Sequence, residues 1–429
     1  MPPVKGTRDF YPPLMAKRNW IIDGWKKISA RNGFEEYDGP IFEYLKIYQV
    51  KSGDEIVEQL FNMTDRGGRQ LAIRPEITPT LARMVNQQIS SLPRPIKWFS
   101  VPRLCRAERP QKGRLREFFQ WNIDIIGVDN VLADAEVILC AVDYLRDIGL
   151  TAGDVVVKIS SRKMLRSLLK EIGIEQNRLD SVYTILDKKS KCSKEAFEAL
   201  LAEQIANEKQ RRQVSELMDC TSLDMVGEAI KLGEEAQSAI RELRELFELL
   251  ELMGIADYCA FDVSVVRGLA YYTSVVFEIY DRGVELRAIC GGGRYDNLLK
   301  DFGGPAISAT GFGMGDCVLG ILLDEKGLWA DSVSTRQVDY YVVYAGADFQ
   351  KEAVKITALL RRAGFGADFS YKGGSLSRQL KQAADADARK CIIVGSEYTD
   401  RGELIIKDMA TGQQSSVRAV DLLRAAGEK

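Results

Sequence analysis

The chain has 429 residues, of which 46% are hydrophobic and 28% charged, as in an ordinary globular protein of two or three domains. No apolar run is long enough to span a membrane, and residues 1–10 lack the apolar core of a signal peptide, so we expect a cytoplasmic protein without a membrane partner. The net charge of −2 neither indicates nor excludes a nucleic-acid partner, because local patches steer such binding.

The side chains that usually hold zinc are scattered or missing. Eight cysteines form no CxxC pair, and the chain contains no histidine, so we predict no protein-bound metal site. Histidine is also the commonest general acid or base. Any reaction that this chain catalyses must therefore proceed without a histidine as acid or base.

Two segments near the N-terminus have clear patterns. Apolar residues at helical spacing predict a helix over residues 13–32, with Gly33 as its C-terminal cap and a strand running into Pro40. Residues 61–74 then predict a hairpin that turns at Gly67 and Gly68. Pro75 stops its second strand and a helix begins near Thr78, where capping and ligand binding are both open.

The stretch from Phe99 to Gly127 predicts two antiparallel strands around a loop marked by proline and glycine. Alternation places Arg106 and Glu108 on one face of the first strand. It also places a second set on one face of the return strand: Arg116, Phe118, Gln120, Asn122 and Asp124. Guanidinium groups bind phosphate oxygens in pairs and stay charged, so this hairpin suits a nucleoside triphosphate. A solvated, charge-balanced hairpin is the alternative.

The remaining segments complete two kinds of domain. We predict a helix over 133–150, a strand over 155–159, charge-rich helices over 161–255, a strand pair over 261–278, and a glycine-rich strand leading into a helix over 310–319. Strands at 339–343, 366–371, 390–395 and 404–408 alternate with helices at 349–363 and 376–387. This alternation predicts a small α/β domain with a largely parallel sheet.

Four motifs carry a resemblance to a known family. The segment from Arg106 to Gln120, with its ERPQKGR wording, resembles motif 2 of class II aminoacyl-tRNA synthetases, and residues 310–318 resemble motif 3. Residues 267–273, RGLAYYT, and residues 291–296, GGGRYD, resemble signatures of histidyl-tRNA synthetases. The resemblance implies an α+β catalytic core on an antiparallel sheet in residues 1–160 and 256–330. A helical insertion at 161–255 and an anticodon-binding domain at 336–429 would complete the chain.

The resemblance also implies roles for individual residues. Arg106 and Arg267 are the expected catalytic residues, at the reacting carboxylate and the α-phosphate. The expected histidine-binding residues are Glu76, Ile77, Thr78, Arg106, Gln120, Asp124, Arg267, Tyr271 and Tyr272, with Asp124 and Tyr272 at the imidazole ring. The expected ATP-binding residues are Arg106, Glu108, Arg109, Arg114, Phe118 and Arg294. Gln111 is the candidate for tRNA contact.

This sequence departs from the family pattern at the ring contact and in motif 3. Asp124 stands where the family more often has glutamate, and Ala270 where it often has aspartate. Motif 3 usually ends in Glu-Arg, but here Cys317 and Val318 occupy those positions. Either another arginine supplies the missing charge, with Arg109, Arg114 and Arg294 as candidates, or ATP handling is altered.

The function implied is that of a homodimeric ligase, which activates L-histidine with ATP and Mg²⁺ and transfers it to the 3′ end of its tRNA. The alternative is a synthetase paralogue that binds histidine as a regulatory sensor. Because a relative of that kind lacks the C-terminal domain, residues 337–429 favour the ligase, whereas Val318 favours the sensor. A chain without histidine could be synthesised even when charged histidine tRNA is scarce, so the supply of such an enzyme would not depend on its own product. Drift within the lineage explains the absence of histidine equally well.

Overall fold

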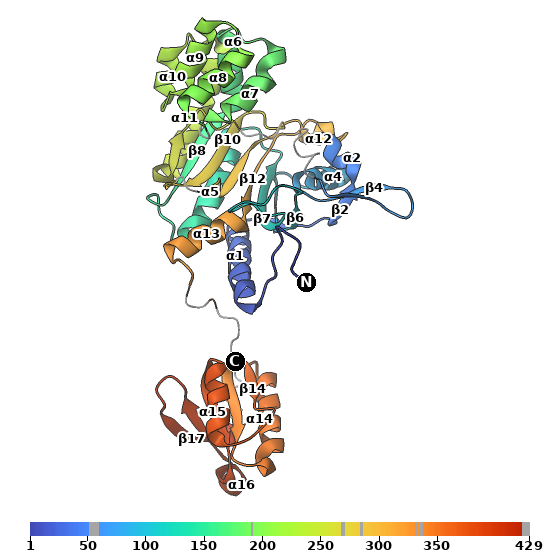
Figure 1. Ribbon diagram of the computed structural model, residues 1–429, viewed down its shortest axis with the longest axis vertical. Coiled ribbons are helices and arrows are strands. Elements are labelled where there is room, and N and C mark those ends of the chain that lie inside the picture. Colours follow the sequence, from blue (N-terminus) through green and yellow to red (C-terminus); the bar gives the residue numbers. More distant parts are fainter. Residues whose placement is uncertain are drawn as a thin grey trace. The chain divides into compact units, whose positions relative to one another are not determined.

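A computed structural model describes residues 1–50, 60–189, 192–266, 271–283, 286–330, 333 and 338–422. The chain divides into two compact units, Met1–Ala330 and Asp331–Lys429 (Figure 1). Within the described residues, no helix has the length and apolar character required to cross a membrane.

The first unit is built on a central sheet in which most neighbouring strands are antiparallel, as predicted. From edge to edge its strands are β1 (Glu35–Glu36), β5 (Ile96–Ser100), β7 (Glu117–Ile126), β12 (Ala309–Gly315), β11 (Cys290–Arg294), β10 (Val275–Asp281), β8 (Val155–Ser161) and β9 (Cys259–Phe261). Only the outermost pairs, β1 with β5 and β8 with β9, are parallel. A further short strand, β6 (Arg103–Cys105), pairs with β7.

The predicted hairpin is present, with β5 and β6 both pairing with β7. The prediction that Arg106 and Glu108 lie on its first strand was wrong. Strand β6 ends at Cys105, so Arg106 and Glu108 lie in the loop rather than on a strand. The backbone N–H of Arg106 still donates to the carbonyl of Arg116 at 2.8 Å, which holds the two sides of the loop together. Because Arg106 and Glu108 are not strand residues, their spacing of two does not place their side chains on the same face.

The predicted pairing of strands within residues 261–278 was also wrong. Strand β8 lies between β9 and β10, and all seven residues of β8 pair with β10. The apolar run Val155–Val157 is buried along its length, as expected for a central strand rather than an edge. The chain therefore reaches β9 through a helical crossover and joins β8 in parallel.

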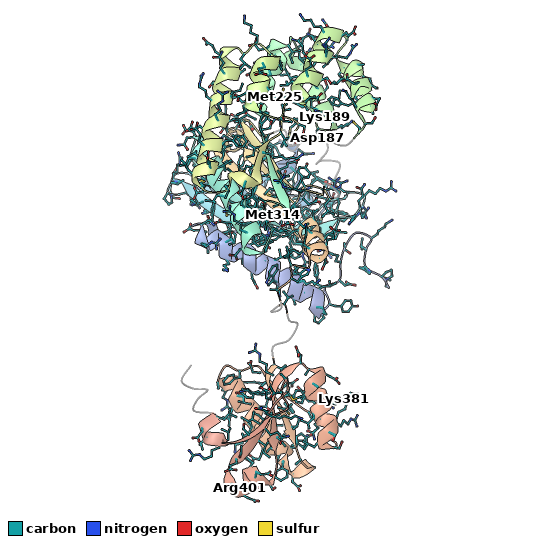
Figure 2. The ribbon with its side chains drawn as sticks, turned by 90° about the vertical axis from the view of Figure 1, so that its left-hand side faces the viewer. Asp187, Lys189, Met225, Met314, Lys381 and Arg401 are labelled. Carbon is teal, nitrogen blue, oxygen red and sulfur yellow. The ribbon has the colours of Figure 1, made fainter. Side chains whose placement is uncertain are left out.

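Helices cover both faces of this sheet, and the side chains of β7 alternate between these two faces. Helices α1 (Pro12–Arg31) and α5 (Val131–Asp147) pack on one face, where the rings of Trp25 and Trp121 stack with centroids 6.1 Å apart. Met314 of β12 is fully buried inside this unit (Figure 2). On the other face lie α4 (Thr78–Gln88) and α12 (Leu298–Asp301), in a second apolar cluster. Helix α13 (Asp316–Lys326) follows β12.

A small separate sheet contains the other predicted hairpin. Its strands are β2 (Phe42–Tyr44), β4 (Gln70–Ile73) and β3 (Asn62–Thr64), and α2 (Leu45–Gln49) follows β2. The turn between β3 and β4 is set by Asp65, whose carboxylate accepts the N–H groups of Gly67 and Arg69 at 2.9 Å. Gly68 has a φ of +78°, which glycine adopts without steric cost.

Residues between β8 and β9 are helical, as predicted. The elements are α6 (Arg162–Glu171), η1 (Gln176–Arg178), α7 (Leu179–Leu186), α8 (Lys194–Gln204), α9 (Glu208–Met218), α10 (Leu223–Ala229), α11 (Glu234–Leu252) and η3 (Ala256–Tyr258). They form a helical layer beyond β8 and β10 (Figure 1). The side chains of Ser161, Ser193, Asn207 and Ser222 cap α6, α8, α9 and α10.

The second unit alternates strands and helices, but its sheet is mixed. Its strand order is β14 (Ala367–Phe369), β13 (Val338–Tyr344), β15 (Ala388–Val394), β16 (Glu403–Asp408) and β17 (Gln414–Arg418), with the first three parallel and the last two antiparallel. The helices are η4 (Ala347–Phe349), α14 (Gln350–Arg362), α15 (Leu376–Asp385) and α16 (Ser396–Arg401). Lys381 and Arg401 lie on the outside of this unit (Figure 2).

Candidate active site

A polar pocket opens on the face of the central sheet that carries the second apolar cluster. Its lining residues are Glu76, Thr78, Arg106, Gln120, Asn122, Asp124, Tyr271, Tyr272, Gly291, Tyr295, Gly311, Phe312 and Gly313. Seven of the nine residues predicted to bind histidine are among them. The fold therefore gathers predicted residues that are up to 196 positions apart in the sequence, since these seven extend from Glu76 to Tyr272.

Glycines on β12 make room for the polar side chains of β7. Gly311 pairs with Asp124, and Gly313 pairs with Asn122. A Cβ atom at position 311 would lie 2.3 Å from Oδ1 of Asp124, and one at 313 would lie 2.7 Å from Cδ of Gln120. The alternating glycines of the motif 3 segment thus allow the side chains of the neighbouring strand to lie flat across the sheet.

Asp124 is a buried acid with one unpaired oxygen. Burial raises its pKa to about 7, and the hydrogen bond that Oδ1 accepts from the hydroxyl of Tyr295 opposes that rise. Oδ2 is buried and has no hydrogen-bond partner among the described residues. A buried acceptor without a donor is costly, so this oxygen is suited to a ligand that brings an N–H group.

Glu76 and Thr78 stand where the chain enters α4. Glu76 is buried, and its Oε2 accepts a hydrogen bond of 3.2 Å from the hydroxyl of Tyr271. Ile77 occupies the N-cap position and no side chain caps the helix, so capping does not explain Thr78, which faces the pocket. The side chain of Ile77 is fully buried in the apolar cluster with Leu81.

Arg106 is held at the rim of the pocket by backbone and ring contacts. Its Nε donates to the carbonyl of Pro75 at 3.0 Å, and its guanidinium lies 5.2 Å from the ring centroid of Phe118. Glu108 is 7% exposed, with Oε2 2.5 Å from Nε of Arg114 and Oε1 4.0 Å from Nη1 of Arg106. One carboxylate thus orients two guanidinium groups.

Arg294, which we predicted to contact ATP, has a different set of partners. It is 4% exposed, and its guanidinium donates to Asp134 and to the backbone carbonyls of Val128 and Asn130. The hydroxyl of Ser308 accepts a further bond. These contacts make Arg294 a link between β11 and the start of α5, so we withdraw it as an ATP ligand.

The other predicted residues fall into two groups. Arg109 and Gln111 lie in the loop that precedes β7, where Gln111 and Arg114 exchange backbone hydrogen bonds of 2.9 Å and Oε1 of Gln111 accepts from Arg287. Arg109 is exposed. Arg267 lies outside the described residues, as does Ala270.

Sequence reasoning missed several residues of the pocket. Asn122 shares the pocket-facing side of β7 with Gln120 and Asp124, but no motif assigns it a role. Tyr295 belongs to the GGGRYD signature and reaches across β12 to Asp124. Its position in that signature was the available signal; the hydrogen bond itself depends on the pairing of β11 with β12, which no local pattern specifies.

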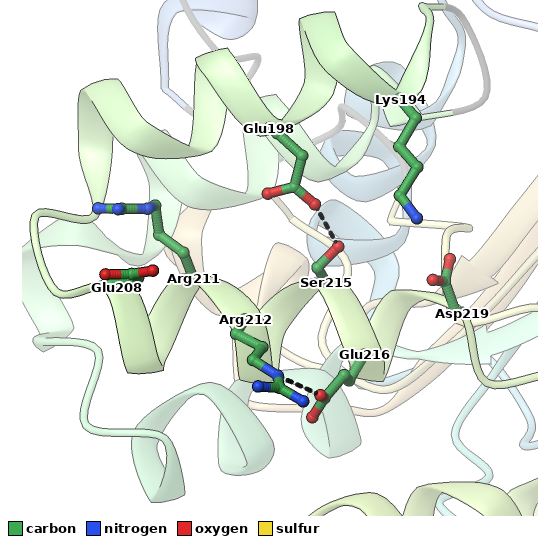
Figure 3. A pocket seen from close by; sticks show the side chains of 8 residues that line it. All are labelled: Lys194, Glu198, Glu208, Arg211, Arg212, Ser215, Glu216 and Asp219. Atoms are coloured by element: carbon green, nitrogen blue, oxygen red, sulfur yellow. Dashed lines mark hydrogen bonds and ion pairs between the residues drawn. The ribbon is translucent and has the colours of Figure 1, made fainter.

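A second cavity, in the helical layer, does not suit a charged ligand. It lies between α8 and α9, and seven of its eight lining residues are charged (Figure 3). They are Lys194, Arg211 and Arg212 against Glu198, Glu208, Glu216 and Asp219. Arg212 pairs with Glu216 at 2.9 Å, and Ser215 donates to Glu198 at 2.6 Å (Figure 3). These charges largely neutralise one another, so no net field favours a phosphate or a cation.

Comparison with known proteins identifies the family. Residues 6–315 match the family model described as histidyl-tRNA synthetase, and residues 339–428 match that of an anticodon binding domain. The histidine–tRNA ligase of Arabidopsis thaliana chloroplasts and mitochondria is 41% identical over 98% of this chain and 85% of its own length. That of Opitutus terrae is 39% identical over 96% of this chain and 95% of its own. The crystal structure of the Nostoc sp. histidyl-tRNA synthetase has the same fold, with a TM-score of 0.84, 21% identity and coverage of 100% of this chain and 99% of that one. The chain therefore belongs to the histidyl-tRNA synthetase family.

Proposed function

We propose that this protein is a histidine–tRNA ligase, which activates L-histidine with ATP and transfers it to the 3′ end of its tRNA. The observation that carries the proposal is Asp124, a buried carboxylate that lines the pocket and whose Oδ2 has no hydrogen-bond partner among the described residues. An imidazole N–H supplies that donor. A site built to hydrogen-bond a polar ring rejects apolar side chains strongly, because they would leave the carboxylate unpaired.

The two ends of the amino acid meet different groups in this proposal. Asp124 and Tyr272 bind the imidazole ring, while Glu76, Thr78 and Gln120 bind the α-ammonium. A carboxylate facing an ammonium makes a charge-assisted hydrogen bond, and Tyr271 fixes the orientation of Glu76. The main chain of Ile77 stays in the proposal as a contact, since its side chain is buried elsewhere.

The adenylation step needs positioning more than proton transfer. A carboxylate oxygen of histidine attacks the α-phosphorus of ATP, the bond to the bridging oxygen breaks, and pyrophosphate leaves. The attacking group is already ionised, so no histidine base is required. Arg106, held by Pro75 and Phe118, stabilises the charge that grows on the α-phosphate. Arg267 remains in the proposal as the second clamp.

Glu108, Arg109, Arg114 and Phe118 complete the proposed ATP site, and Gln111 is kept as a tRNA contact. Mg²⁺ enters this proposal with the phosphates of ATP, because the described residues hold no group of three or more side chains able to cage a metal ion. Glu108 is the carboxylate among the arginines that could meet such an ion. One or two carboxylates together with phosphates form an ordinary Mg²⁺ site.

A homodimer and a cytoplasmic location belong to the same proposal. Support for the dimer comes from the small sheet, where Ile41, Phe42, Tyr44 and Met63 expose between 43% and 58% of their surface. Exposed apolar side chains gathered on one sheet are typical of an interface. The cytoplasm is proposed because charged tRNA is consumed where ribosomes translate.

Exchange of labelled pyrophosphate into ATP, with free L-histidine and no tRNA, tests the proposed activity. We expect exchange that depends on histidine, followed by charging of histidine tRNA when it is added. The rival is a regulatory histidine sensor, favoured by the missing arginine at Val318. Histidine binding without exchange would support the sensor, whereas the match of residues 339–428 to an anticodon binding domain supports the ligase.

A further inference from the structure

The position of the missing motif 3 arginine is closed by apolar packing. Val318, which stands there, is 6% exposed and belongs to the main core cluster. Its Cγ2 would lie 3.0 Å from a Cβ atom at Gly113, so it packs directly beneath the loop that precedes β7. Valine carries no charge, so any charge that replaces the motif 3 arginine must come from another residue.

Two of the three arginines considered as substitutes are already engaged in ion pairs. Arg294 is buried against Asp134 on the far side of β11. Arg114 holds Glu108 at 2.5 Å, so part of its charge is neutralised. Arg109 is exposed on the loop and shows no ion pair among the described residues, but it belongs to the same loop as Arg114 rather than to the strands beside motif 3.

Arg287 lies in the connection that leads into β11, the strand beside motif 3. It precedes β11, whose Cys290 pairs with Met314 of β12. The next bond along this ladder joins the N–H of Gly315 to the carbonyl of Ile289 at 3.2 Å. Residues 286–288 therefore lie beside the end of β12 and the start of α13, which is where motif 3 should present its arginine.

The side chain of Arg287 turns toward the loop that precedes β7. Its guanidinium donates a hydrogen bond to Oε1 of Gln111. Partial burial lowers the pKa of Arg287, the charge of Arg114 lowers it further, and Glu108 opposes this. Because Gln111 exchanges backbone hydrogen bonds with Arg114, Arg287 lies beside the loop that carries Arg114, although the two arginines come from separate segments of the chain.

The charges in this neighbourhood do not balance. Arg106 and Arg114 approach the single carboxylate of Glu108, and Arg287 brings a third guanidinium to the same loop through its hydrogen bond to Gln111. Like charges held close together raise the free energy of the empty site, and a polyanion between them relieves the repulsion. A guanidinium that keeps one exposed edge can also bind two phosphate oxygens at once.

We propose that Arg287 contacts the terminal phosphates of ATP and takes the place of the motif 3 arginine that this chain lacks. The inference rests on the proposed function and adds to it a residue outside the family motifs. In it, Arg106 faces the α-phosphate while Arg287 and Arg114 face the leaving pyrophosphate.

Three variants test this role. Arg287→Ala removes the guanidinium, and Arg287→Lys keeps a charge without the planar fork. Arg282→Ala is the matched control, because Arg282 comes from the same connection between β10 and β11 but donates to the carbonyl of Ala152 at 2.5 Å. Calorimetry measures the affinities for ATP and for AMP, and pyrophosphate exchange gives the KM for ATP and for histidine.

We expect Arg287→Ala to weaken ATP binding and raise its KM about 10- to 100-fold, the effect of losing a charge-assisted hydrogen bond. AMP affinity and the KM for histidine stay within about twofold of the wild-type values. Arg287→Lys recovers part of the ATP affinity, and Arg282→Ala behaves as wild type.

Other outcomes overturn the inference. Unchanged ATP affinity in Arg287→Ala would show that Arg287 makes no phosphate contact. An equal loss of ATP and AMP affinity would show that it only positions the loop through Gln111. A wild-type protein that binds ATP but gives no exchange would refute the proposed function instead, and the ATP and AMP affinities of the variants would still decide the role of Arg287.

Discussion

Asp124 gives a pH dependence whose sign follows from its environment. Its pKa is about 7 in the folded chain, raised by burial, against about 3.9 in an unfolded one. Between these values the folded state holds the proton more tightly, so its contribution to the free energy of unfolding falls as the pH rises from about 4 to about 7. We expect Asp124→Asn to remove on the order of 3 kcal/mol of the difference between pH 5 and pH 8. Urea unfolding at both pH values measures it, and an unchanged difference would contradict the raised pKa.

Glu76 gives a second prediction, because it is assigned to the α-ammonium alone. Glu76→Gln keeps the hydrogen bond from Tyr271 but removes the negative charge. We expect L-histidine to bind about 10- to 100-fold more weakly, the cost of losing a charge-assisted bond. Imidazolepropionic acid, which has the ring and the carboxylate but no ammonium, should bind the variant and the wild type alike. Equal losses for both ligands would mean that Glu76 supports the pocket rather than the ammonium.

At the scale of elements, β12 offers a matched pair of substitutions. Gly313→Ala places a Cβ atom 2.7 Å from Cδ of Gln120, whereas a Cβ atom at Gly315 meets nothing within 4 Å. We expect Gly313→Ala to displace Gln120 and raise the KM for histidine at least about tenfold, since the ammonium loses a partner. Gly315→Ala should change that KM little. Similar values for the two variants would remove the proposed role of Gln120.

The elements that the sequence predicted well are those whose signals are local. Helix α1 follows from apolar spacing, and the turn at Gly68 from a residue that tolerates positive φ. Strand β17 was missed because its QSSVR sequence is polar and exposed, with no buried face to mark it. The pairing of β9 with β8 rather than β10 depends on a crossover between distant segments, which no local pattern contains.

The same distinction explains the candidate site. Glu76, Arg106 and Asp124 were found because each lies in a short motif or a strand with alternating side chains. Arg294 also lies in a motif, but its partner Asp134 comes from α5, so no local pattern indicates that its guanidinium is already paired. Arg287 lies outside the motifs, and its position beside motif 3 follows only from the pairing of β11 with β12.

At the scale of the whole molecule, the proposed dimer rests on the small sheet. Phe42 is 52% exposed on β2, whereas Leu252 is 84% exposed at the end of α11. In analytical ultracentrifugation we expect the wild type to have twice the 48.0 kDa mass of one chain. Phe42→Glu should shift it toward one chain, because burying a charge at an apolar interface is unfavourable, and Leu252→Glu should not. A wild-type monomer, or a dimer unaffected by Phe42→Glu, would place the interface elsewhere or remove it.

The second unit separates the ligase from the sensor at this scale. Its match to an anticodon binding domain covers residues 339–428, while the match to the synthetase model ends at residue 315. A histidine sensor gains nothing from reading an anticodon, so a chain that keeps both parts is expected to bind tRNA. The net charge of the whole chain, −2, neither supports nor excludes tRNA binding.

The most direct test of the account is a crystal of the protein soaked with L-histidine and ATP. The account predicts one ring nitrogen within hydrogen-bond distance of Oδ2 of Asp124, the α-ammonium at Glu76, and the carboxylate facing the α-phosphate beside Arg106. Histidine bound with its ring away from Asp124, or a pocket that admits ATP but no histidine, would contradict it.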